Sequence, residues 1–434
     1  MKSLKWAMVL LACTVGPAAA QSPRALTLGE AIGRGWSNGV NAMLARLAAT
    51  GADTRVGETR AALLPDVSAG ASVERQTINL HEFGIAIPGF PAVTDPFTLY
   101  RGRAQFTQLL YDAATLEHLR IARDSAVMAG LDARNVGQLS AALAGAAWLQ
   151  LASAQATITA REDDSVTAFA LLDIATSRVN AGAAPRIDLT RSQTEAAATR
   201  TALAVARNAR DRATLELARA VGLPPATPLV ASGEPVLAGD SLPTDPDSAV
   251  ALADRRRSDL AAEQQRLVML REGLTAIKRE RLPQATASGY IQTSGTRTDS
   301  LYRTWNIGVG VSLPIFDGFR RERREDEQQV RIDAEQVRLD DLRDQVDADA
   351  RQAVLDLASA RDQVALATER LRLADEVLSE ARDRFSAGVT GTVETTNAQA
   401  DVAQARDVLI QARLAVGVAQ VSAARALGLL DQVH

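Results

Sequence analysis

The sequence pattern around Arg178 recurs around Arg384, 206 positions later in the chain. This duplication restricts the possible folds more than any single motif. The coinciding positions include several charged residues and glycines. They run Arg178, Ala181, Gly182, Asp188, Gln193, Arg200 and Gly222 in the first half and Arg384, Ala387, Gly388, Glu394, Gln399, Arg406 and Gly428 in the second. Two copies of one unit are typical of a ring, a tube or a pseudo-symmetric channel. An active site would not need the doubling.

The first 20 residues have the pattern of an export signal. Lys2 and Lys5 precede an apolar run, and three consecutive alanines end at Ala20. The only cysteine, Cys13, lies inside this segment, so the mature chain is predicted to have neither a thiol nor a disulfide. A lipoprotein signal is the alternative, in which cleavage before Cys13 would leave that residue lipidated at the mature N-terminus. The triple alanine favours cleavage after Ala20. Either signal sends the protein out of the cytoplasm.

The composition favours long, closely packed helices over a large globular core. Aromatic residues make up only 4% of the 434 residues, and alanine is the dominant apolar residue, which lets helix backbones approach each other. The net charge of -4 is close to neutral for this length, and nucleic acid is therefore not an expected partner. No apolar run after the signal is expected to reach the roughly 20 residues of a membrane-spanning helix. Any crossing of a membrane is predicted to use strands.

Each half is predicted to run in the order helix, strand pair, very long helix, turn and returning helix. The opening helices are expected at 28–62 and 248–281, each ending at a Leu-Pro pair. The predicted divisions are a signal peptide at 1–20, a first repeat at 21–223, a proline-rich connector at 224–246 and a second repeat at 247–434.

The strand pairs are recognised by alternation of apolar with polar or glycine residues. They are expected at 66–75 and 98–110 in the first repeat, and at 284–293 and 304–314 in the second. A soluble sheet would show the same alternation, but strands of about ten residues favour a transmembrane barrel. Four strands cannot close a barrel, and an open edge in lipid would leave backbone groups without partners. The chain is therefore expected to oligomerise.

The long helices carry a seven-residue repeat of large and small apolar residues. Leu357, Leu378 and Phe385 belong to this repeat, which is typical of coiled-coil packing, whereas Arg161 interrupts its counterpart in the first half. Glycine at the turns and an acid near each following N-terminus indicate helical hairpins. The hairpins are predicted at 113–222, with a tip near 180–188, and at 318–428, with a tip near 386–394.

This order of elements resembles the TolC family of outer-membrane efflux and secretion channels. Besides Gln193 and Gln399, the resemblance rests on Leu26-Thr27-Leu28-Gly29-Glu30-Ala31, Leu110-Tyr111-Asp112 and Ile315-Phe316-Asp317, and it covers nearly the whole mature chain. It implies a mainly α fold with membrane β: a homotrimer whose twelve-stranded barrel, four strands per chain, continues into a periplasmic coiled-coil barrel. It implies a periplasmic membrane-fusion adaptor, an inner-membrane pump of the RND or ABC type and outer-membrane lipid as partners, and no cofactor.

The favoured function is passive export of small molecules, such as drugs, by the outer-membrane channel of a tripartite efflux system. One alternative keeps the channel and assigns it to type I protein secretion. Another, of a different class, is a periplasmic coiled-coil adaptor or scaffold without a pore. Catalysis is not expected, because no nucleophile elbow, phosphate loop or Cys/His constellation occurs in the sequence. His81, His118 and His434 are too scattered to suggest a metal site.

The resemblance also implies roles for residues at the tips. Glu394 stands at the position of an acid that lines the aperture in the family, whereas Asn397 replaces a second such acid. Phe385 replaces a tyrosine whose hydroxyl helps to close the aperture. Asp188 matches an acidic partner in that closure. A ring of three Glu394 carboxylates would favour cations. The alternative is that Glu394 and Asp188 serve only as acids at helix N-termini. Adaptor docking is expected at Arg178, Ala181, Gly182, Arg384, Ala387 and Gly388.

Overall fold

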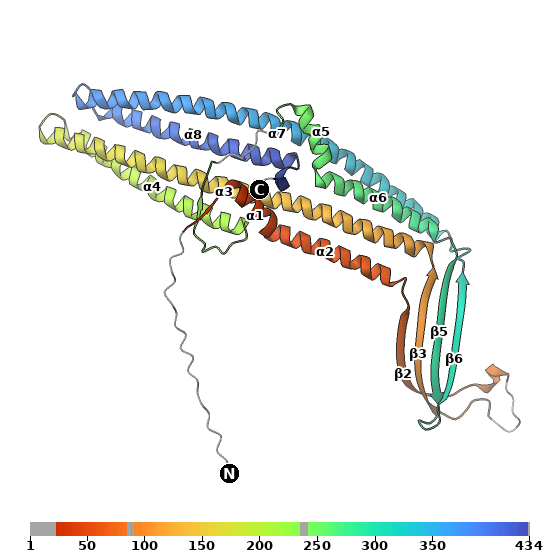
Figure 1. Ribbon diagram of the computed structural model, residues 1–434. Coiled ribbons are helices and arrows are strands. Elements are labelled where there is room, and N and C mark those ends of the chain that lie inside the picture. Colours follow the sequence, from red (N-terminus) through yellow and green to blue (C-terminus); the bar gives the residue numbers. More distant parts are fainter. Residues whose placement is uncertain (1–22, 85–87, 89–90, 235–241, 433–434) are drawn as a thin grey trace, which may run out of the picture.

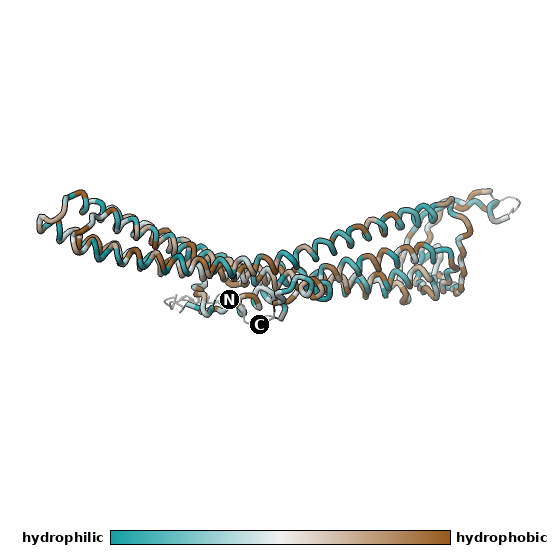
Figure 2. Tube along the Cα trace, turned by 90° about the horizontal axis from the view of Figure 1, so that it is seen from above, coloured by the Kyte–Doolittle hydropathy of each residue, from teal (hydrophilic) through white to brown (hydrophobic). Residues whose placement is uncertain are grey.

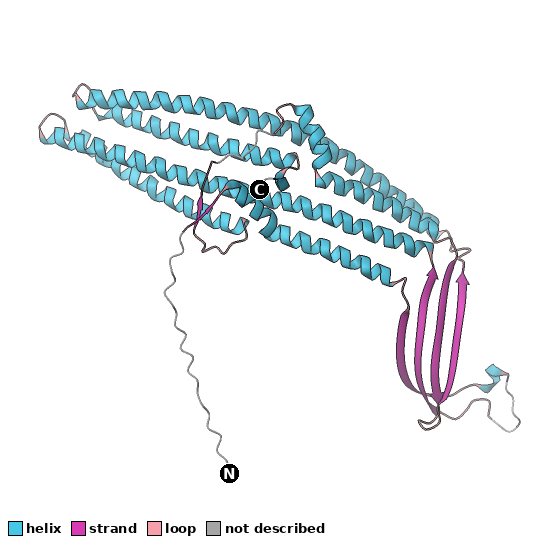
Figure 3. Ribbon diagram, in the orientation of Figure 1, coloured by secondary structure: helices cyan, strands magenta, loops and turns pink. Residues whose placement is uncertain are grey.

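The computed structural model describes residues 23–84, 88, 91–234 and 242–432. The predicted signal peptide, Cys13 included, lies outside the described residues. The molecule is an elongated helical body with one sheet at its end (Figures 1 and 3). The helices are α1 (Leu28–Asn38), α2 (Val40–Ala61), α3 (Ala113–Asn180), α4 (Arg186–Ala220), α5 (Pro246–Arg256), α6 (Ser258–Arg279), α7 (Arg320–Ser386) and α8 (Thr392–Ala426), with 3-10 turns at Leu80–Phe83 and Leu430–Gln432.

The opening helix of each repeat is divided in two, unlike the single helices expected at 28–62 and 248–281. The first division is at Gly39, whose extended backbone separates α1 from α2, and the second is at Arg257, which separates α5 from α6. The end of α1 lies close to α3: a Cβ on Gly35 would lie 2.5 Å from the Cβ of Ala144, and a Cβ on Gly39 would lie 3.2 Å from the Cβ of Ser140. The helix direction therefore changes where α1 meets α3.

The main sheet is antiparallel throughout and has the strand order β2-β3-β5-β6. Its strands are β2 (Asp66–Gln76), β3 (Phe97–Tyr111), β5 (Gln284–Gly295) and β6 (Tyr302–Ser312). One face carries apolar side chains that remain exposed; Trp305 and Val311, for example, are 73% and 71% exposed. The outer strands β2 and β6 have no strand beside them in the described part of a single chain. Both edges and one apolar face are thus available for further packing.

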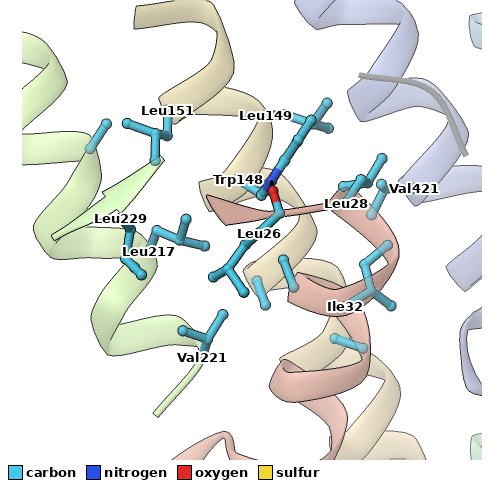
Figure 4. Packing of buried hydrophobic residues seen from close by; sticks show 14 of the residues in the cluster. Leu26, Leu28, Ile32, Trp148, Leu149, Leu151, Leu217, Val221, Leu229 and Val421 are labelled. Atoms are coloured by element: carbon cyan, nitrogen blue, oxygen red, sulfur yellow. Dashed lines mark hydrogen bonds between the residues drawn. The ribbon is translucent and has the colours of Figure 1, made fainter. Parts of the chain in front are cut away.

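The largest apolar cluster lies in the middle of the body, where the connector crosses the helices. The connector contains a strand that its proline content hides: β4 (Leu229–Ala231) pairs in parallel with β1 (Arg24–Leu26). Trp148 of α3 is fully buried here, and its indole Nε1 donates a hydrogen bond of 2.7 Å to the Leu26 carbonyl (Figure 4). Leu217 of α4 packs into the same cluster. This cluster holds the first repeat to the connector.

Elsewhere the body is held by narrow seams between the helices of each hairpin. Apolar and polar residues alternate along the helices, both toward the hairpin tips and toward the sheet (Figure 2). In the second hairpin Leu378 and Ala381 of α7 pack against Ala398 and Val402 of α8. The expectation that no later segment is apolar enough to span a membrane is wrong by length and composition, because α8 passes that test. Its alanine and valine side chains pack partly along α7, as at Ala398 and Val402, and partly into the central cluster, as at Val421 and Ala424.

Candidate functional site

The two hairpin tips lie side by side at the end of the body opposite the sheet (Figure 1). Each long helix ends in a glycine with positive φ, +70° at Gly182 and +79° at Gly388. The amide after each glycine donates to a carbonyl five residues earlier, 2.8 Å to Arg178 and 3.0 Å to Arg384. This pairing is a Schellman motif, in which glycine takes the left-handed conformation at little cost. The tips are therefore equivalent in backbone structure.

Arg178 joins the first hairpin to the second. Its Nη1 donates a hydrogen bond of 2.8 Å to the carbonyl oxygen of Phe385, and its guanidinium carbon lies 4.9 Å from the centroid of the Phe385 ring. The ring is buried against Leu171 and Ala175 of α3. Phe385, expected in the position of a tyrosine, thus contacts the other hairpin through packing and its backbone. The sequence did not reveal this contact, because it is formed by residues 207 positions apart.

Asp188 forms a second link between the hairpins. Its Oδ1 accepts a hydrogen bond of 2.8 Å from the hydroxyl of Thr392, the first residue of α8, and both side chains are buried. Arg191, one turn along α4, lies 3.9 Å from the same oxygen. Asp188 also lies in the first turn of α4, where a carboxylate complements the helix dipole. It therefore serves as an N-terminal acid and as an acceptor from the neighbouring hairpin.

Glu394 remains within its own hairpin. Its Oε1 lies 2.9 Å from Nη1 of Arg384, and both side chains are substantially exposed. Asn397, three residues along α8, is exposed as well. Ala181 and Ala387, in the two turns, are exposed too. The polar residues Arg384, Glu394 and Asn397 therefore lie at the same solvent-accessible end of the molecule as both turns. An assembly could use this end to line an aperture or to meet another protein.

A buried ionic cluster connects α3 to α8 between the tips and the central cluster. Asp164, 5% exposed, accepts hydrogen bonds of 2.9 Å from Arg161 and 2.8 Å from Arg406, while the amide of Gln399 donates to its carbonyl. Arg161 also pairs with Asp407. Burial lowers the pKa of Arg161, but the carboxylates of Asp407 and Asp164 outweigh that effect and raise it. The cluster explains the interrupted seven-residue repeat, since an arginine in an apolar seam requires carboxylate partners.

A carboxyl pair lies nearer to the sheet, between α6 and α3. Burial raises the pKa of Glu272, and the neighbouring Asp124 and Glu117 raise it further, to about 7, although Arg120 opposes the shift. In the described structure Oε2 of Glu272 is buried without a hydrogen-bond partner. A proton shared with Asp124 would satisfy both observations. Across the described ranges, no group of three or more His, Cys, Asp or Glu side chains could hold a metal ion.

Comparisons with known proteins agree with this arrangement. A family model described as outer membrane efflux protein matches residues 38–223 and 249–429. Protein CyaE of Bordetella pertussis is 29% identical over 308 residues, covering 69% of this chain and 60% of that protein, so the chain spans less than two thirds of this relative.

Solved structures share the fold at lower identity. The Campylobacter jejuni CmeC outer membrane channel matches with a TM-score of 0.79 at 16% identity, covering 92% of this chain and 85% of that chain. The open state of the Neisseria gonorrhoeae MtrE outer membrane channel matches with a TM-score of 0.73 at 16% identity, covering 93% and 89%. Both likenesses support one fold for the whole described chain.

Proposed function

Since the chain belongs to the outer membrane efflux protein family, we propose that three copies of it close into one channel for the passive export of small molecules. Family membership places the protein in the outer membrane with its helices in the periplasm, and makes it a channel component and not an enzyme. The trimer, the cargo and the partner proteins are the proposed parts.

The observation that carries the proposal is the open four-stranded sheet. One face exposes apolar side chains such as Trp305 and Val311, as lipid contact requires. The edges at β2 and β6 present backbone N–H and C=O groups, each of which would cost several kcal/mol in lipid if left without a partner. Three chains would pair β6 of one copy with β2 of the next and form a twelve-stranded barrel without edges. The helices attached to the strands would then form a second tube below it.

The tips support the proposed partners. Their turns are exposed, and Gly182 and Gly388 have no side chain that would cover the backbone at the turn. We expect a periplasmic adaptor protein to dock here, on Arg178, Ala181, Gly182, Arg384, Ala387 and Gly388, and to connect the channel to an inner-membrane pump of the RND or ABC type. The Arg178 and Asp188 links would hold the aperture closed until docking.

Two measurements test the proposal. Purified protein in a planar bilayer should conduct ions, and a water-soluble monomer that needs no detergent would contradict it. Deletion of the gene should sensitise cells to at least one toxic compound, with complementation by the intact gene as the control. Unchanged sensitivity across a broad compound panel, combined with a loss of secreted proteins, would assign the channel to protein export.

A further inference from the structure

The polar face of the sheet carries two arginines on adjacent inward positions of β3. The apolar face contacts lipid in the proposed barrel, so the opposite face lines the lumen. Arg103 lies on this face between Gly70 of β2 and Gln292 of β5, and Gln292 is followed by Thr304 of β6. The row across all four strands therefore contains one cation and no acid. Arg101 lies two residues further along the same strand.

The structure leaves Arg103 available for a ligand. Its guanidinium carbon lies 3.8 Å from the centroid of the Tyr290 ring, which fixes its position by a cation–π contact. Among the described residues Arg103 forms no ion pair, and its side chain is exposed. Gly70 opposite it leaves open space, since a Cβ there would meet no atom within 4 Å. The cation is held in place, and no carboxylate of the described residues pairs with it.

Arg101 completes a groove with Arg103. The groove has a volume of about 340 Å³ and is lined on its other side by small residues of β2, including Ser68 and Ser72. Glu74 lies 3.5 Å from Arg101 and neutralises part of its charge. The Nε of Arg101 is nevertheless buried without a hydrogen-bond partner in the described structure. A buried donor of this kind costs free energy unless an acceptor is supplied.

We propose that Arg103 and Arg101 form a binding groove for the anionic groups of solutes that pass through the barrel. This inference rests on the proposed trimeric pore, in which the groove occurs three times around the lumen. A guanidinium presents paired N–H donors that match a carboxylate or a phosphate, and the hydroxyl of Ser68 adds a further donor, whereas the Ser72 hydroxyl donates to Glu74. The ligand class is a small solute with carboxylate or phosphate groups. The barrel would thus present cations to a passing solute, whereas the tips, at the opposite end of the molecule, present the acids Asp188 and Glu394.

The test uses the intact trimer and inorganic pyrophosphate as the probe. We expect pyrophosphate added from the barrel side to block single-channel current, and radiolabelled pyrophosphate to bind the detergent-solubilised trimer. Arg103→Gln should raise both the half-blocking concentration and the dissociation constant roughly tenfold, as expected for loss of a charge-assisted bond. Arg303→Gln is the matched control, because Arg303 lies on the same sheet with its side chain on the apolar face.

The outcomes separate this inference from the proposed function. Conducting trimers that neither bind pyrophosphate nor are blocked by it would overturn the groove and leave the pore intact. Equal losses in Arg103→Gln and Arg303→Gln would overturn it too, because a general charge effect would then explain the binding. Protein that does not conduct at all would contradict the pore itself. Thermal melting of both variants checks that the barrel has assembled.

Discussion

The two hairpin tips share one backbone design, yet their equivalent side chains make different contacts. Arg178 leaves its own hairpin and binds the carbonyl of Phe385, whereas Arg384 pairs with Glu394 inside the second hairpin. Asp188 likewise accepts a hydrogen bond from the other hairpin, through Thr392. The duplication thus preserves the turn and the helix starts, while the contacts between the halves depend on partner residues that differ, such as Phe385 where the first repeat has Val179. Equivalent positions should therefore respond differently to the same substitution.

The largest difference is expected within the buried ionic cluster. Asp164→Ala would leave Arg161 and Arg406 partly buried without their shared carboxylate, at a cost of about 3 kcal/mol in the free energy of unfolding. Arg370 occupies the same position in the second repeat and is exposed, so Arg370→Ala should cost less than about 0.5 kcal/mol. Thermal unfolding of the detergent-solubilised protein, followed by circular dichroism, measures both. Equal shifts would mean that the cluster contributes no more than the surface.

A second pair of variants tests the tips directly. Arg178→Ala removes a charge-assisted hydrogen bond and a cation–π contact between the hairpins, worth about 2 kcal/mol together, and should raise the open population roughly thirtyfold. Arg384→Ala breaks only an exposed pair within one hairpin and should leave the conductance near that of the wild type. Single-channel recording compares them. An increase in both variants would show that the link between hairpins is not what closes the aperture.

The opening helices give a comparison that depends on pH. The raised pKa of Glu272, about 7, means that the folded protein holds a proton that the unfolded chain has lost above about 4.5. The stability that this one group contributes is therefore fully present below pH 4.5 and is lost as the pH rises to 7, by about 1 kcal/mol once solvent screening is allowed for. Thr54 stands at the corresponding position of α2, 218 residues earlier, and cannot titrate.

Glu272→Gln removes the titrating group and should flatten stability between pH 4.5 and 7. Thermal melting across this range measures the slope, and Thr54→Val is a control that should keep the wild-type slope. Equal slopes in the wild type and in Glu272→Gln would mean that Asp124 and Glu272 do not share a proton.

Much of the fold followed from the sequence, because the features that encode it are local or periodic. The predicted fold of the single chain is confirmed, as alternation revealed the strands and the seven-residue repeat revealed the hairpins, while the closed trimeric barrel stays a prediction. The break at Gly39 was missed because the contact of α1 with α3 joins residues far apart in the sequence, and β4 was missed because its partner within the described residues is the distant β1.

Less of the candidate site could be predicted. The turn glycines Gly182 and Gly388 were visible from their spacing, since the left-handed conformation is a local requirement. Arg161 was visible as an interruption of the repeat, but its partner Asp407 lies 246 residues away, and no local pattern connects them. The luminal arginines were visible only as polar members of an alternating strand. Which polar positions meet each other depends on strand register, which a single sequence does not specify.

The smallest effects are expected for the exposed pair at the second tip, and their signs distinguish the two roles considered for Glu394. Both side chains are largely solvated, so Glu394→Gln and Arg384→Ala should each change stability by less than about 1 kcal/mol. If three Glu394 carboxylates line the aperture, Glu394→Gln should reduce the preference for cations, whereas Arg384→Ala should increase it by removing a neutralising charge. Reversal potentials in a KCl gradient measure both shifts. Opposite shifts place the carboxylate at the aperture, while unchanged potentials in both variants would leave Glu394 as an acid that only complements the N-terminus of α8.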